Sequence, residues 1–306
     1  MGGGGGGYSI SSGDLDDLRR QVEERTRQTL ATSEINALLG DELARINQRD
    51  IPKTSEYLDG IRDALGEDVE GFEKLLFGGS VSKHTYVDGL SDIDSLVVLK
   101  GEQLKGLSPA ELRERFKTAL QERLGAGDVA DIRVGNLAVT VRYRDGIEIQ
   151  LLPAVRHGDR IEISSADGQR WKSIEPQRFA ARLTEVNQKQ RGQVVPTIKL
   201  AKTMIDQLPE DSRLSGYHVE ALAVAAFADY KGSTTPKDML TRFFDAASEA
   251  VLRPAPDSTG QSRHIDEALG TSGSSERQRR ARALAQIARR MEQSGSVRDW
   301  QQLMGS

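Results

Sequence analysis

Cysteine is absent from this sequence of 306 residues. The chain therefore has no disulfide, no thiolate nucleophile and no Cys-ligated zinc site. Long hydrophobic runs are missing as well, since none approaches the roughly 18 residues of a membrane-spanning helix, and no secretory signal sequence is recognisable. We therefore expect a cytoplasmic protein that neither crosses a membrane nor is secreted.

A strong charge of one sign is also lacking. The 42 Lys and Arg residues nearly balance the 46 Asp and Glu residues, so the formal net charge is −4. A protein that coats nucleic acid carries clustered Lys and Arg, because these side chains neutralise phosphates. The balance disfavours that role but leaves room for a local basic site. The length fits one large domain or two packed domains with a sizeable core.

Hydrophobic periodicity divides the chain into helical and strand-rich parts. Residues 1–13 are rich in glycine and are expected to form a flexible tail or a tag remnant. Apolar residues recur at three- and four-residue steps over 14–49 and again over 52–66, which predicts N-terminal helices. Short runs rich in Val and Ile predict strands, with one helix among them at Pro109–Leu124. The predicted strands are Ser95–Leu99, Leu137–Arg142, Ile147–Leu152 and Ile161–Ser164.

After residue 176 the pattern becomes helical and stays so, apart from a loop rich in Pro, Gly, Ser and Thr at 253–275. The expected fold class is α+β. An N-terminal helical segment and a small mixed sheet fill residues 14–170, and a C-terminal helical domain fills residues 171–306. We expect the functional site where the sheet meets these helices. The predicted C-terminal helices are 177–190, 194–207, 217–231, 236–252 and 276–293.

The most informative segment lies just before the first predicted strand. Gly79-Ser80 is expected to open a short helix, where free backbone N–H groups and a hydroxyl can hold a phosphate. Asp92 and Asp94 are separated by one residue at the start of the strand, so both carboxylates point to one face, roughly 6.5 to 7 Å apart along the backbone. Either feature alone has an ordinary structural explanation, as a helix start or a polar turn. Their joint occurrence favours a site for phosphate and metal.

A pair of carboxylates on one strand face can hold Mg²⁺, a hard cation that completes its shell with water and substrate phosphates. Two such ions can activate an attacking hydroxyl and stabilise a departing pyrophosphate. The arrangement therefore predicts nucleotidyl transfer with two Mg²⁺ ions as cofactor, for which Mn²⁺ is a substitute. Asp92 and Asp94 are the predicted metal ligands and catalytic residues.

The small, polar and acidic residues of this segment form one longer pattern, Gly79-Ser80-x-x-Lys83-x-Thr85-x-x-x-Gly89-x-Ser91-Asp92-x-Asp94. It resembles the polymerase-beta-like nucleotidyltransferases, in particular the oligoadenylate synthetases and the bacterial cGAS/DncV-like nucleotidyltransferases (CD-NTases) of CBASS anti-phage systems. The resemblance implies that Gly79, Ser80 and Lys83 bind nucleotide. It further implies template-independent joining of nucleoside triphosphates, with ATP favoured and pyrophosphate released. The implied product is a cyclic or short linear oligonucleotide second messenger, sensed by a downstream effector that does not bind this chain.

The same resemblance leads us to expect a third carboxylate on a neighbouring strand, in a pattern like Asp-x-x-Pro-Ala. The corresponding run is Gln150-Leu151-Leu152-Pro153-Ala154, so an amide stands where the base is expected. Glu148 lies two residues earlier on the same strand face, and we predict it as the third metal ligand and catalytic carboxylate. In the alternative, Glu148 merely faces solvent and the enzyme is weakened or inactive.

Further nucleotide-binding candidates lie in the helical half. Lys199 and Lys202 are three residues apart on one helix face, and the resemblance implies that a lysine of this helix neutralises the donor triphosphate, with Lys202 the better fit. Ser215 and Tyr217 lie at the start of the next helix. The resemblance implies that Ser215 touches the phosphates and that Tyr217 stacks on or near a base. Glu220 is expected to brace the fold. The structural alternatives are a solvated helix face for the lysines and a helix cap for Ser215.

The remaining polar features give weaker indications. The four histidines, His84, His157, His218 and His264, are spaced unlike a metal cluster. Arginines crowd the helix at 276–293, a surface that an activating nucleic acid would need, although a solvated helix is the plainer explanation. A nucleic-acid activator and a regulatory partner therefore stay open.

Two other functions compete with the leading hypothesis. One is a nucleotidyltransferase that acts on an RNA or DNA 3′ end, a protein or a tRNA. The other is a catalytically inactive NTP-binding module, which Gln150 at the expected carboxylate position would explain.

Overall fold

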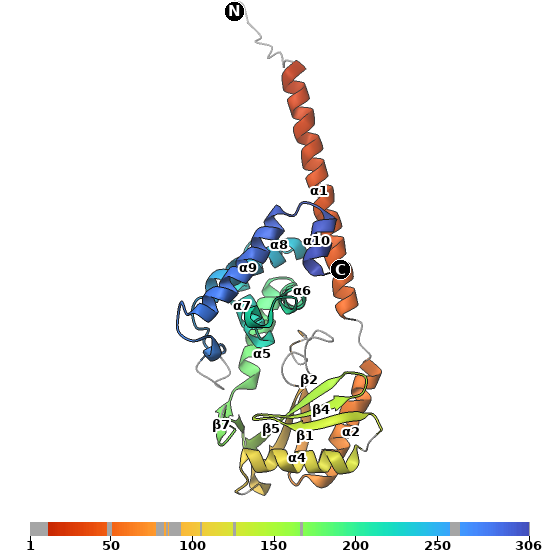
Figure 1. Cartoon of the computed structure of the whole chain (residues 1–306), viewed down its shortest axis with the longest axis vertical. Coiled ribbons are helices and arrows are strands. Elements are labelled where there is room, and N and C mark those ends of the chain that lie inside the picture. The colour runs from red at the N-terminus through yellow and green to blue at the C-terminus, as the bar shows by residue number, and fades with distance from the viewer. Residues whose placement is uncertain are drawn as a thin grey trace, which may run out of the picture.

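The computed structural model describes residues 12–47, 51–77, 83, 85, 93–104, 106–124, 127–165, 168–257 and 264–305. Over these ranges the chain has an α+β fold in which a mixed sheet lies between two groups of helices (Figure 1). Helices α2 and α4 cover one face of the sheet, and the C-terminal helices form a second body beyond the sheet. Residues 1–11 of the predicted tail lie outside the described residues. The first helix begins at Ser12.

Two N-terminal helices precede the sheet, α1 (Ser12–Ile46) and α2 (Ile51–Asp68), as the apolar periodicity predicts. The N-terminal part of α1 projects beyond the body of the molecule (Figure 1), and Leu30 on this part is 59% exposed. The C-terminal part packs against the C-terminal helices, with Ile35 and Leu39 fully buried in their core. Helix α1 thus belongs to the helical core by its contacts, whereas α2 packs against the sheet.

In the described part of the chain the sheet has seven strands, five of them in the order β1-β2-β5-β4-β3, while β6 pairs with β5 and β7 pairs with β6. Strands β2 and β5 pair in parallel, and the other pairs are antiparallel. One face packs on α2 and on α4 (Pro109–Arg123), which begins with a capping box at Ser108. The strands are β1 (Phe72–Phe77), β2 (Ile93–Lys100), β3 (Val129–Val134), β4 (Val139–Tyr143), β5 (Glu148–His157), β6 (Arg160–Ser164) and β7 (Trp171–Ile174).

The four strands expected from Val- and Ile-rich runs are present as β2, β4, β5 and β6, and the sequence interpretation missed β1, β3 and β7. All three missed strands lie at the ends of the sheet. An edge strand has one paired side only and tolerates charged residues, so it lacks the continuous apolar run of a central strand. Strand β1 contains Glu73 and Lys74, and β3 contains Asp131 and Arg133.

The C-terminal helices share one core, in which Trp300 is fully buried. The five predicted helices are present, with bounds within a few residues of those expected. Helix α10 was not predicted, because it is short. Among the described residues no helix is long and apolar enough to span a membrane. The helices are α5 (Pro176–Lys189), α6 (Val194–Asp206), α7 (Gly216–Phe227), α8 (Pro236–Ala250), α9 (Ser275–Gln293) and α10 (Val297–Met304), with short 3-10 helices at Gly101–Gln103, Glu210–Ser212 and Glu267–Leu269.

Candidate active site

Four buried or nearly buried polar side chains meet where the segment before β2 contacts the helical body. Lys83 and Thr85 come from the motif segment, Lys202 from α6 and Glu220 from α7. The carboxylate of Glu220 accepts hydrogen bonds from Lys83, from the Thr85 hydroxyl and from Lys202 Nζ, the last at 2.9 Å. Lys202 Nζ also donates to the Thr85 carbonyl oxygen at 3.0 Å. We call these residues the Glu220 node.

The electrostatics of the Glu220 node favour a fully ionised carboxylate. The side chain of Glu220 is 1% exposed, and those of Lys83 and Lys202 are 10% and 6% exposed. Burial opposes ionisation of Glu220, but the two lysine charges and the hydrogen bonds from Lys83 and Thr85 outweigh it and lower the pKa of Glu220. The node joins the motif segment to α6 and α7 through charges that water cannot screen.

An aromatic pair adjoins the Glu220 node. The rings of Phe179 on α5 and Tyr217 on α7 pack edge to face with centroids 4.8 Å apart. Lys83 Nζ lies 5.1 Å from the centroid of each ring, within the range of a cation–π interaction. The hydroxyl of Tyr217 donates a hydrogen bond to Asp257 at 3.0 Å. The ring of Tyr217 is therefore held from two sides.

The first turn of α7 is shaped by local sequence. Ser215 is the N-cap, and its hydroxyl accepts a hydrogen bond from the backbone N–H of His218. At Gly216 a Cβ atom would lie 3.3 Å from Lys202 Nζ, so a side chain there would crowd the lysine. The cap and the glycine together bring the start of α7 close to the end of the Lys202 side chain.

The sheet side of the site is built on the parallel pair of β2 and β5. Asp94 in β2 is the register partner of Gln150 in β5, so the backbone positions of these two residues lie side by side in the sheet. Glu148 begins β5 two residues earlier, and its side chain is 31% exposed and lies 3.5 Å from Arg133. Carboxylate and amide oxygens are the hard donors that Mg²⁺ accepts, so the donor set at this end of the strand pair fits that ion.

The structure brings together some of the predicted site residues. Lys83 and Lys202 share the Glu220 node, and Tyr217 adjoins it. Lys199 points elsewhere, since its ammonium donates a hydrogen bond to Asn47 at the end of α1 at 2.5 Å. Gly79, Ser80 and Asp92 lie outside the described residues, as does the side chain of Asp94. Within the described residues no group of three or more His, Asp or Glu side chains is arranged to hold a metal ion.

Sequence reasoning missed the contribution of Phe179 to this neighbourhood, and it included Thr85 in the motif without assigning it a role. Phe179 lies on the buried face of the amphipathic helix α5, a pattern that indicates a core residue and nothing about a site. Glu220 gives a clearer signal, because it is the only charged residue in the apolar helix α7, where burial requires a partner.

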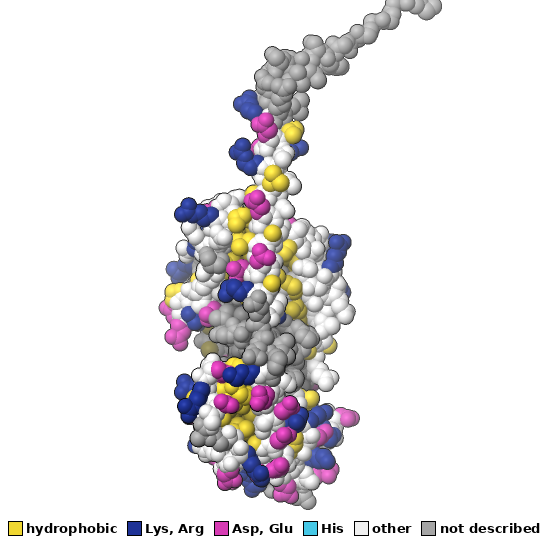
Figure 2. Space-filling model, turned by 90° about the vertical axis from the view of Figure 1, so that its right-hand side faces the viewer, with side chains coloured by type: hydrophobic (Ala, Val, Ile, Leu, Met, Phe, Trp, Pro, Cys, Tyr) yellow, Lys and Arg dark blue, Asp and Glu magenta, His cyan; other side chains and the backbone are white. Residues whose placement is uncertain are grey.

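The arginine-rich helix α9 is less solvated than its composition suggests. Arg277 is fully buried and pairs with Asp266 at 2.6 Å, and Arg280 pairs with Glu276 at 2.9 Å. On the face that carries α1, the basic and acidic side chains of the described residues are interspersed (Figure 2).

Comparison with known proteins gives structural matches only. No protein-family model and no curated protein matches the sequence. The E. coli MS115-1 CdnC of a CdnC:HORMA-deltaN complex is 16% identical with a TM-score of 0.66, over 88% of this chain and 96% of that one. The Bradyrhizobium diazoefficiens CD-NTase CdnG in complex with GTP is 17% identical with a TM-score of 0.64, over 83% and 89%. The Rhodothermus marinus CdnE c-UMP-AMP synthase with Apcpp and Upnpp is 18% identical with a TM-score of 0.58, over 81% and 95%.

TM-scores of 0.58 to 0.66 over most of the chain establish the fold, and at identities of 16 to 18% the likeness concerns the fold alone. The matches extend over most of the chain and include both the sheet and the helical body. They agree with the architecture expected from the motif segment. The chain therefore has the fold of the CD-NTases, the cGAS/DncV-like nucleotidyltransferases.

Proposed function

We propose that the protein is a Mg²⁺-dependent, template-independent nucleotidyltransferase. It joins nucleoside triphosphates, with ATP favoured, into a cyclic or short linear oligonucleotide second messenger of bacterial anti-phage (CBASS) signalling, and it releases pyrophosphate. The observation that carries the proposal is the meeting of Lys83 from the motif segment with Lys202 and Glu220 on a CD-NTase fold. Among the structural relatives, one is in complex with GTP and another is a c-UMP-AMP synthase.

The acidic residue types at the start of β2 and β5 support a metal-binding role for this end of the strand pair. Asp92 and Asp94 hold the metal, and Glu148 completes the site as the third carboxylate. Bound Mg²⁺ supplies Lewis-acid stabilisation of the phosphates and of the departing pyrophosphate. Glu148 also accepts the proton of the attacking hydroxyl, because a carboxylate can act as a general base and the amide of Gln150 cannot.

The triphosphate is bound by groups from both bodies of the fold. Gly79 and Ser80 offer backbone N–H groups and a hydroxyl, and Lys83 and Lys202 supply positive charge. Ser215 contributes its hydroxyl at the start of α7, and Tyr217 packs on or near a base. Because Lys83 and Lys202 are already held by Glu220, they are fixed in position before substrate arrives. The HORMA complex of the CdnC relative supports a regulatory protein partner.

A double substitution tests the proposal. Asp92→Ala with Asp94→Ala is expected to abolish pyrophosphate release from a mixture of the four ribonucleoside triphosphates and Mg²⁺, while the circular dichroism spectrum stays unchanged. The matched control is Asp59→Ala with Asp63→Ala, which removes two aspartates from the exposed face of α2. The control is expected to turn over like the wild type. Unchanged turnover by the Asp92 and Asp94 variant would contradict the proposal.

One structural observation favours a second function, an inactive NTP-binding module. Gln150, which cannot take up a proton, is the register partner of Asp94. That module would bind NTP with Mg²⁺ and show no turnover under any activating condition, including added RNA, DNA or protein. Isothermal titration with ATP alongside the pyrophosphate assay separates the two functions.

A further inference from the structure

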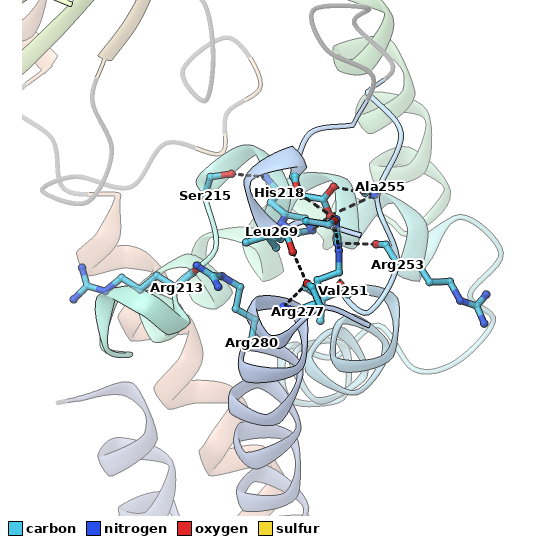
Figure 3. Close-up of polar contacts among 12 residues, drawn as sticks. Arg213, Ser215, His218, Val251, Arg253, Ala255, Leu269, Arg277 and Arg280 are labelled. Atoms are coloured by element: carbon cyan, nitrogen blue, oxygen red, sulfur yellow. Dashed lines mark hydrogen bonds and ion pairs between the residues drawn. The ribbon is translucent and has the colours of Figure 1, made fainter. Parts of the chain in front are cut away.

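A buried arginine fixes the loop that connects α8 to α9. Arg277 in the first turn of α9 is fully buried, and its guanidinium donates hydrogen bonds to the carbonyl oxygens of Val251, Arg253 and Gly270, each at 3.0 Å (Figure 3). It also pairs with Asp266 at 2.6 Å. These acceptors lie at both ends of the loop, so one rigid fork of donors holds both ends in place.

Asp266 extends this fixed arrangement into the loop. Its carboxylate oxygens accept hydrogen bonds from the backbone N–H of Ala255 at 3.1 and 3.3 Å. The N–H of Ile265 donates to the carbonyl oxygen of Ala255 at 3.0 Å, so the two described arms of the loop are also joined directly. Asp257 follows two residues after Ala255 and accepts the hydrogen bond from the hydroxyl of Tyr217. Hydrogen bonds from Arg277 through Asp266 to Ala255, the short stretch of backbone to Asp257, and the Tyr217 hydrogen bond thus connect Arg277 with Tyr217.

Tyr217 is the point where these contacts reach the candidate site. Its ring packs edge to face on Phe179 and lies 5.1 Å from Lys83 Nζ. We propose that Asp257, held by the Arg277–Asp266 pair, is a positioning residue that fixes the ring of Tyr217 for nucleoside triphosphate binding. The proposal rests on the proposed function, because the affinity in question is that of the same nucleotide site.

The expected effect is on substrate affinity. Without the hydrogen bond to Asp257, the Tyr217 ring keeps its packing on Phe179 but loses one constraint on its orientation. Loss of one net hydrogen bond corresponds to a decrease in affinity of about three- to tenfold. The chemical step uses the carboxylates at the sheet, so kcat is expected to stay within about twofold of wild type.

The variants separate positioning from general stability. Tyr217→Phe and Asp257→Ala each remove the hydrogen bond, and both are expected to raise KM for the NTP about three- to tenfold. The double variant is expected to show no further loss, since both changes break the same bond. Asp257→Asn restores an acceptor, so its KM is expected to lie nearer to wild type than that of Asp257→Ala.

A matched control exists on the same helical body. The hydroxyl of Tyr230 donates to the Ser233 carbonyl oxygen at 3.0 Å, and its ring packs edge to face on Phe227, so Tyr230→Phe removes an equivalent bond away from the site. Its thermal stability is expected to change as in Tyr217→Phe, while its KM stays at the wild-type value.

Three results would overturn the positioning proposal. One is an unchanged KM in Tyr217→Phe, another is a loss confined to kcat, and the third is an equal rise of KM in Tyr230→Phe. If the wild type shows no turnover at all, the proposed function fails instead, and equilibrium binding of ATP by the same variants decides the positioning proposal. Wild-type protein that does not bind ATP would overturn both.

Discussion

The sharpest prediction concerns the charge of Glu220. Glu220→Gln keeps the size of the side chain but removes the carboxylate charge that pairs with the nearly buried Lys83 and Lys202. Removing one partner of a buried ion pair costs about 3 to 5 kcal/mol, because the remaining charge is left uncompensated. With an unfolding entropy of about 2.1 cal/mol/K per residue, each kcal/mol lowers the unfolding midpoint temperature of a 306-residue chain by roughly 1.6 °C, so a decrease of about 5 to 8 °C is expected.

Glu185→Gln is the matched control for this prediction. Glu185 on α5 also contacts two basic residues, Arg182 and Lys189, each at 2.7 Å, but all three side chains are about half exposed. Exposed pairs of this kind contribute little, since water and salt screen them. We expect calorimetry to show a nearly unchanged midpoint for Glu185→Gln. Equal midpoints for the two variants would refute the reasoning that burial makes the Glu220 node strong.

The pH dependence of this effect has a definite sign. Because the pKa of Glu220 lies below its ordinary value of 4.5, its contribution to stability is present above that value and is lost as pH falls through the lowered pKa. The difference between wild type and Glu220→Gln is therefore expected to be full at neutral pH and to shrink in acid. Urea unfolding at several pH values measures it, and a difference that grows below about pH 4 would contradict the assignment of a charged Glu220.

Two further predictions concern His218 and β5. Burial lowers the pKa of His218 from 6.5 to about 4, against the raising effect of Asp266, so the unfolded chain takes up a proton first and stability is expected to fall between those values as pH drops. His218→Gln should flatten that part of the profile, and an unchanged slope in urea unfolding would show that His218 is not its source. For β5, Glu148→Gln is expected to reduce kcat by about a hundredfold or more, whereas Gln150→Ala should have a smaller effect. Turnover measurements with the opposite ranking would assign the third position to Gln150.

Much of the architecture could be predicted from periodicity, and the exceptions have physical reasons. The Val- and Ile-rich strands are central and buried, so their composition is distinctive, whereas the charged edge strands β1 and β3 are not. The motif segment led to the CD-NTase fold because its glycines, lysine and aspartates occur at a specific spacing. Periodicity could not indicate that the second half of α1 packs on the C-terminal helices, since an amphipathic helix does not name its partner.

The site was predictable in its residue types and unpredictable in its pairings. Lys199 and Lys202 are both candidates in sequence, with Lys202 the better fit by resemblance, and the three-residue step turns Lys199 toward Asn47 and Lys202 toward Glu220. Lys83 and Glu220 are separated by 137 positions, so only the tertiary fold brings them together.

Arg277 carried a signal that composition concealed. It shares the buried face of α9 with Ala281, Leu284, Ala288 and Met291, at alternating steps of four and three residues. A charged residue on such a face requires a buried partner, which here is Asp266. The interpretation of the whole helix as one solvated basic surface did not distinguish the buried Arg277 from the exposed arginines.

The central claim is that the chain converts nucleoside triphosphates alone into an oligonucleotide. Mass spectrometry of a reaction containing the wild-type chain, all four ribonucleoside triphosphates and Mg²⁺ tests it most directly, with EDTA as the control. We expect a new cyclic or short linear oligonucleotide together with pyrophosphate, both lost when EDTA is added. Product that forms only after RNA, DNA or protein is supplied as acceptor, or no product despite ATP binding, would contradict the claim.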